Sequence, residues 1–181
     1  MLTLSLLRHA KSSWANPLLA DFDRPLAPRG EKAAPRIGAF IAAQGLIPDL
    51  ILCSGSARTR QTLALAAEHW PPQANIGSDK ANVRYDDGLY HATVPAMFAQ
   101  LHGAPDGKTH LMMVGHNPGM EAFAAQLVGG GEPADLRNLT HKYPSGALAV
   151  IAFKTPHWRD IGPGDGHLTL FKRPKDLRDA T

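Results

Sequence analysis

Short apolar runs that alternate with longer amphipathic segments are the feature that most strongly limits the fold of this chain. Five runs have the length and apolar content of β-strands, at residues 3–7, 49–53, 110–114, 147–153 and 168–171. Between them lie segments typical of helices, at residues 30–44, 56–69, 94–102 and 118–128. Strands and helices in alternation predict a layered α/β domain with a largely parallel central sheet.

Proline and glycine residues indicate where several of these segments begin and end. Gly45 directly follows the helix predicted over 30–44, which is typical of a helix C-terminus. Pro35 lies either in the first turn of that helix or inside a helix that begins earlier and is kinked. We interpret Gly129–Gly131 as a loop, and the tail 174–181 as a candidate for a disordered segment at the end of a single domain, 1–181.

Composition limits the partners and the compartment that we expect. A chain of 181 residues, 44% of them apolar, can bury a sizeable core. The net charge of +3 is spread over interleaved acidic and basic residues, so we expect no binding to nucleic acid. The opening MLTLSLL lacks the basic flank of a signal peptide, and no window is long enough to span a membrane, so no membrane partner is expected. A single cysteine fits the reducing cytoplasm.

Polar clusters follow three of the predicted strands at the point where each strand ends. Arg8 and His9 follow the first strand, SGSARTRQT (54–62) follows the second, and GHNPG (115–119) follows the third. The carboxyl ends of parallel strands converge on one crevice, where ligands bind. The sequence therefore predicts a site that brings together Arg8, His9, Arg58 and His116.

Two arginines and two histidines favour a phosphoryl group as the ligand. Guanidinium groups match the paired oxygens of a phosphate, and the turns lead into helices whose free N–H groups attract anions. Each residue alone is more often structural or solvated, and the agreement of three strands carries the prediction. The chain has no Walker or G-x-G-x-x-G motif, no H-E-x-x-H and no C-x-x-C, so we expect no nucleotide cradle, no metal and no cofactor.

Cys53 does not have the spacing of a cysteine phosphatase, which wraps phosphate with C-x5-R. Four residues separate Cys53 from Arg58 and six separate it from Arg60. Because Cys53 also completes the apolar run DLILC, we interpret it as a packed strand residue.

Six segments occur in one order and carry a family resemblance: LLRHAKSSW, DRPLAPRGEKAA, PDLILCSGSARTRQT, YDDGLYHA, VGHNPGMEAFA and YPSGALAV. Together they resemble the phosphohistidine phosphatase branch, the SixA-type proteins, of the histidine phosphatase superfamily. The resemblance covers residues 3 to about 153. It implies the phosphoglycerate mutase-like fold, a three-layer α/β/α domain, and a phosphoenzyme mechanism.

The resemblance also implies a role for individual residues. His9 matches the nucleophile, Arg8 and Arg58 match phosphate ligands, and His116 matches the second histidine of the pocket. Arg24, in DRPL, matches a further basic residue at the mouth. The chain departs from the common pattern in two ways: Ala10 stands where glycine is commoner, and Asn16 is offset by one residue from an asparagine of larger members.

The implied reaction is in-line phosphoryl transfer to a neutral His9, with Arg8, Arg58 and a protonated His116 on the phosphate oxygens. Water then hydrolyses the phosphohistidine intermediate, and no metal is required. A backbone carbonyl is expected to fix the tautomer of His9. Asp86 and Asp87 are the candidates for a general acid, with solvated or capping roles as the alternative.

Three functions remain open for such a site. The first is hydrolysis of phosphohistidine in a protein, and the second is a phosphomonoesterase that acts on a small phosphorylated metabolite. The third is a phosphoprotein-binding module without catalysis, which would keep the arginines but would not need His9. The sequence leaves open whether the protein is a monomer or a dimer.

Overall fold

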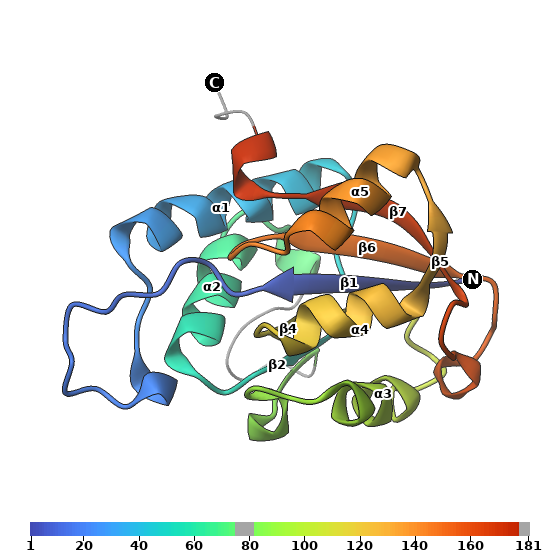
Figure 1. The fold of residues 1–181 in the computed structure, drawn as a ribbon, viewed down its shortest axis with the longest axis horizontal. Coiled ribbons are helices and arrows are strands. Elements are labelled where there is room, and N and C mark those ends of the chain that lie inside the picture. Colours follow the sequence, from blue (N-terminus) through green and yellow to red (C-terminus); the bar gives the residue numbers. More distant parts are fainter. Residues whose placement is uncertain (75–81, 178–181) are drawn as a thin grey trace.

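The computed structural model describes residues 1–74 and 82–177, and its seven strands form one sheet in the order β3-β2-β4-β1-β6-β7-β5 (Figure 1). The strands are β1 (Leu2–Arg8), β2 (Leu50–Cys53), β3 (Val83–Tyr85), β4 (His110–Gly115), β5 (Val128–Gly131), β6 (Leu148–Phe153) and β7 (Gly166–Lys172). The longer helices are α1 (Pro28–Ala43), α2 (Ala57–Ala67), α3 (Val94–His102), α4 (Gly119–Leu127) and α5 (Pro133–His141).

The sheet is largely parallel, as the sequence predicts. β1 runs parallel to β4, β4 to β2, β2 to β3, and β5 to β7. β6 is antiparallel to both of its neighbours, β1 and β7, so it alone of the seven runs against the rest. The ends of β1, β2 and β4 therefore lie at one edge of the sheet, where the polar clusters follow them.

Helices cover both faces of the sheet and make the three-layer α/β/α architecture. One face packs on α1 and α2, with residues such as Leu7 of β1 against Ile37 and Ile41 of α1. The other face packs on α3, α4 and α5, with residues such as Leu4 and Leu6 of β1. Because β1 is buried on both sides, its run is almost continuously apolar and shows little alternation.

The ends of α1 follow ordinary helix chemistry. Pro28 occupies the first turn, where the missing N–H costs nothing, and Gly45 takes φ = +65° just past the C-terminus, as predicted for a helix stop. Pro35 lies inside the helix, which begins two residues before the predicted start at residue 30. Of the two interpretations of Pro35, the earlier start is therefore the correct one.

Two predictions about local structure were wrong. Gly129–Gly131 was interpreted as a loop, but with Val128 these residues form β5 on the edge of the sheet, because their backbone pairs with β7. The tail was a candidate for disorder from residue 174. Pro174–Asp176 instead form a short 3-10 helix, and Leu177 is buried against the α1 side of the sheet. Residues 178–181 of the predicted tail lie outside the described residues.

None of the helices in the described ranges combines the length and the apolar character needed to cross a membrane.

Candidate active site

The site begins where β1 ends, between the two central neighbours of that strand. The N–H of Arg8 donates to Ala147 O, and the N–H of His9 donates to Gly115 O. These hydrogen bonds extend the pairing of β1 with β6 and β4 by one residue on each side. The backbone at Arg8 and His9 is therefore held by both neighbouring strands, and both side chains leave the sheet from a fixed position.

His9 is held in one tautomer at the bottom of the site. Its side chain is 7% exposed, and its Nδ1 lies 2.7 Å from Ala10 O. A carbonyl only accepts, so Nδ1 carries the proton and Nε2 is left as a free base. Burial, together with the nearby charges of Arg58, Arg8 and Arg24, lowers the pKa of His9 to about 4. The backbone carbonyl expected from the sequence is that of Ala10.

His116 lies beside His9, with 5.1 Å between the ring centroids. Its Nε2 is 2.9 Å from the hydroxyl of Ser54, which follows β2, and its buried Nδ1 has no hydrogen-bond partner among the described residues. Burial, and then the neighbouring His9 and Arg58, lower the pKa of His116 to about 3. In the free site the ring is therefore neutral and offers one N–H, whereas the protonated His116 expected from the sequence belongs to the site with a phosphoryl group bound and stays a prediction.

Three arginines surround the histidines. Arg8 donates from Nη1 to Tyr143 O at 2.7 Å, and burial lowers the pKa of its guanidinium. Arg58 is 3% exposed and Arg24 is 5% exposed. Both of these arginines bind the carboxylate of Asp21, Arg58 through Nη2 at 2.8 Å and Arg24 through Nη1 at 2.6 Å.

Asp21 is thus the centre of the mouth of the site, and the sequence analysis did not single it out. Besides the two arginines, its carboxylate accepts the hydroxyl of Tyr90 at 2.5 Å and lies 3.4 Å from Nε2 of His91. The hydrogen bond from Tyr90 is the largest of the effects that lower the pKa of Asp21. The sequence did contain a signal, because Asp21 lies just before DRPL, and Tyr90 and His91 lie at the end of YDDGLYH. The sequence alone does not show that these two segments are in contact.

Of the two general-acid candidates, Asp86 has the capping role that was the alternative for it. Asp86 accepts the N–H of Gly88 at 2.7 Å and the side-chain amide of Gln100 at 2.5 Å, so it caps the turn after β3. Asp87 faces Gly55, where an added β-carbon would come within 1.9 Å of its Oδ1. Among the residues that the structure describes, neither carboxylate is hydrogen-bonded to His9, His116 or Arg58.

Cys53 takes the structural role expected of it, and Arg60 lies exposed on α2. Cys53 is fully buried in β2, and burial raises the pKa of its thiol to about 12, which keeps it protonated. Arg60 donates to Gly55 O at 2.8 Å and stacks on Tyr85. Within residues 1–74 and 82–177, no three histidine, cysteine or acidic side chains gather as they would around a metal ion.

Comparison with known proteins places this geometry in a family. Residues 4–87 match the model of the histidine phosphatase superfamily (branch 1). A protein of Mycobacterium tuberculosis strain H37Rv, itself uncharacterised, is 35% identical over 171 residues, which cover 93% of this chain and 100% of that protein. A solved structure of a candidate phosphohistidine phosphatase SixA from Nakamurella multipartita is 30% identical, with a TM-score of 0.77, and the match covers 96% of each chain. The chain is a SixA-type member of the histidine phosphatase superfamily.

Other structures agree with this assignment. The candidate SixA from Agrobacterium tumefaciens is 31% identical, with a TM-score of 0.75, and the match covers 96% of this chain and 99% of that one. A likeness in fold alone extends to a candidate α-ribazole-5′-phosphate phosphatase from Escherichia coli, with 17% identity and a TM-score of 0.65 over 96% of this chain and 98% of that one. This SixA-type chain has the phosphoglycerate mutase-like fold, and it is a phosphatase that acts on a phosphorylated substrate.

Proposed function

We propose that this SixA-type phosphatase removes phosphate from phosphohistidine in a protein, through a phosphohistidine intermediate on His9. The observation that carries the proposal is the state of His9: its Nδ1–H is held by Ala10 O, and a lowered pKa of about 4 leaves Nε2 unprotonated near neutral pH. A free imidazole nitrogen beside three guanidinium groups is a nucleophile next to an anion site.

In the first step, Nε2 of His9 attacks phosphorus while the bond from phosphorus to the substrate nitrogen breaks. The electron pair of that bond goes to the substrate imidazole, which leaves neutral when its other nitrogen carries a proton. Arg8, Arg58 and Arg24 neutralise the three non-bridging oxygens, and an N–H of His116 donates a further hydrogen bond. The unpartnered, buried Nε of Arg8 supports a ligand with several acceptor oxygens.

In the second step, water attacks phosphorus from the side that the substrate imidazole has left. The bond to Nε2 of His9 breaks, inorganic phosphate forms, and His9 returns to its neutral state. The same cations stabilise both steps because the phosphoryl group stays in place. His9 replaces the substrate imidazole in the first step, and water replaces His9 in the second.

Phosphohistidine is favoured over a phosphomonoester by the positions of the acidic side chains. An alkoxide leaving group needs a general acid, whereas a protonated imidazole leaves without one. Asp86 uses its carboxylate to cap a turn, and the pKa of Asp21 is lowered, so neither supplies a proton easily. The structures of the two relatives with 30% and 31% identity carry the same substrate class in their names.

A small phosphorylated metabolite is the second candidate. The exposed Asp87, on the loop beside Gly55, is the acid that this function would use. The proteins of the same fold include a candidate phosphatase for such a metabolite.

The test is phosphate release from a phosphohistidine peptide and from a phosphoserine peptide of the same sequence, with EDTA present, for wild type and His9→Ala. We expect turnover of the first peptide, little turnover of the second, and none in the variant. A preference for the phosphoserine peptide that depends on Asp87 would support the second candidate. Undiminished turnover in His9→Ala would contradict the mechanism.

A further inference from the structure

Exposed large apolar side chains are concentrated in one short segment beside the site. Trp14 is 72% exposed, Leu18 is 92% exposed and Leu19 is 38% exposed. Within the described residues, the remaining exposed large apolar side chain is that of the terminal Met1. Single exposed apolar residues are ordinary, but three within six positions form a patch that fits an interaction surface. We name residues 13–20 the apolar loop.

The apolar loop has a defined backbone. The hydroxyl of Ser13 accepts the N–H of Ala15 at 3.1 Å, and Asn16 Oδ1 accepts the N–H of Leu18 at 3.0 Å. Pro17 fixes one further backbone angle between them. These hydrogen bonds define a turn from which Leu18 points outward. A partner that binds Leu18 therefore loses little free energy in ordering the loop.

The apolar loop is joined to the anion site by Arg24. The guanidinium of Arg24 lies 3.2 Å from the centroid of the Trp14 ring, and its Nε donates to Ser13 O at 2.9 Å. The same guanidinium binds Asp21, which also binds Arg58. A molecule bound across Arg24 would meet phosphate ligands on one side and the apolar loop on the other.

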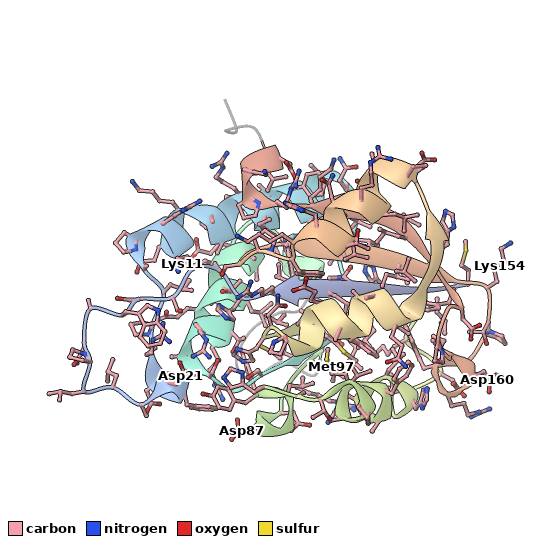
Figure 2. All side chains as sticks on the ribbon, viewed as in Figure 1. Lys11, Asp21, Asp87, Met97, Lys154 and Asp160 are labelled. Carbon is pink, nitrogen blue, oxygen red and sulfur yellow. The ribbon has the colours of Figure 1, made fainter. Side chains whose placement is uncertain are left out.

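The apolar loop lies on the same side of the molecule as the mouth of the site. Figure 1 shows the segment after β1, in blue, reaching out past the end of that strand and returning at α1. In Figure 2 Lys11 and Asp21 lie on this side, and Lys154 lies at the opposite end of the sheet. Leu18 comes shortly before Asp21 in the sequence, and it is almost fully exposed.

We propose that the apolar loop recognises the polypeptide that carries the phosphohistidine, by packing Leu18, Leu19 and the edge of Trp14 against apolar side chains that flank it. This proposal rests on the proposed function, since it names the partner of the same site. A small metabolite would be enclosed by the charged mouth and would leave Leu18 in water. A polypeptide continues beyond the phosphate and reaches the loop. Tryptophan and arginine, which stack on each other here, are two of the residue types that dominate protein interfaces.

The experiment uses two phosphohistidine peptides of equal length, one with leucine and phenylalanine around the phosphohistidine and one with serine at those positions. Wild type is compared with the double variant Leu18→Ser, Leu19→Ser. Trp14 is left in place because it supports Arg24. Phosphoramidate, which has no polypeptide, is the third substrate. Lys154→Ser is the control at the far end of the sheet, and Ala15→Ser is the control within the loop.

We expect wild type and both controls to prefer the apolar peptide by about tenfold in kcat/KM, mainly through KM. The double variant should lose this preference and keep the wild-type rate on phosphoramidate. Equal rates on both peptides in wild type, or a preference that survives in the double variant, would overturn the proposal. So would an equal loss on phosphoramidate, because that result would assign the loop a purely structural role.

Two further outcomes have separate meanings. No turnover of either peptide or of phosphoramidate would contradict the proposed function itself, before the loop is considered. A wild-type dimer that the double variant converts to monomer, measured by analytical ultracentrifugation, would identify a second copy of this chain as the occupant of the loop and would also overturn the proposal.

Discussion

The bottom and the mouth of the site are built by different forces. At the bottom, His9 and His116 are buried and are held by backbone groups and by Ser54. At the mouth, Asp21 is 41% exposed and is held by charged and hydroxyl groups from separate segments, among them Arg58 of α2. Burial keeps the imidazoles neutral, whereas the hydrogen bond from Tyr90, and then those from Arg58 and Arg24, keep the carboxylate ionised. In the proposed function, the bottom supplies the nucleophile, and the charged groups of the mouth bind the anionic phosphate.

The largest expected effect comes from the bottom. His9→Ala should lower kcat on a phosphohistidine peptide by at least about 10⁴-fold, because no other free imidazole occupies its place. His110 is the matched control: it is a partly buried histidine at the start of β4, 2.8 Å from the hydroxyl of Ser5 and away from the ends that form the site. His110→Ala should cost stability and leave kcat within about threefold of wild type. Equal losses in both variants would remove the distinction between a catalytic and a structural histidine.

The second-largest expected effect involves both the bottom and the mouth of the site. Arg58→Ala should lower kcat/KM by about 100-fold, since it removes two oxyanion donors and leaves Asp21 with fewer cationic partners. Arg60→Ala is the control on the same helix, because Arg60 stacks on Tyr85 and donates to Gly55 O. Its kcat/KM should change by less than about threefold. A similar loss in both variants would mean that overall positive charge, rather than the position of Arg58, binds the substrate.

The pH profile tests the burial of the bottom. Because the pKa of His9 is lowered to about 4, the nucleophile should stay neutral, and kcat on phosphoramidate should keep its value from pH 7 down to about 5. An ordinary histidine would lose about tenfold by pH 5.5. The same shift makes stability depend on pH. Between pH 6.5 and about 4, His9 is protonated in the unfolded chain but stays neutral in the folded protein, so the free energy of unfolding falls as the pH falls through that window. An acid limb near pH 6.5 would contradict a desolvated His9.

A smaller effect tests the charge balance of the mouth. Asp21→Asn keeps an oxygen for Arg58 and Arg24 but removes a negative charge next to the anion site, so inorganic phosphate should inhibit about fivefold more strongly. Asp21→Ala also removes the acceptor that orients both arginines, and it should weaken phosphate inhibition. Weaker inhibition in both variants would mean that orientation of the guanidinium groups outweighs repulsion by the carboxylate.

The smallest effect on activity is expected outside both regions. Asp86→Ala should cost about 1 kcal/mol of stability, measured by urea unfolding, because it removes the cap on Gly88 and the acceptor of Gln100. Its kcat should stay within about twofold of wild type. A large loss of kcat with an unchanged unfolding midpoint would restore Asp86 as a general acid.

The same contrast explains what the sequence could and could not predict. The strands β1, β2, β4 and β6 are apolar runs because both of their faces are buried, and the ends of β1 and β4 lead to His9 and His116. The missed strands β3 and β5 are the two edges of the sheet, where VRY and VGGG bury little. The missed helix α5 buries only Leu139. Asp21 and Tyr90 meet through two loops, and periodicity carries no information about where loops meet.

The reversed direction of β6 has a consequence for the order in which the parts of the site are synthesised. Because β6 runs against β1, the turn before it reaches the site from late in the chain, and the N–H of Gly146 donates to the carbonyls of both Arg8 and His9. During synthesis a ribosome releases His9 well before Gly146. The backbone at His9 is therefore held in place only once this later segment has been made and has folded against β1.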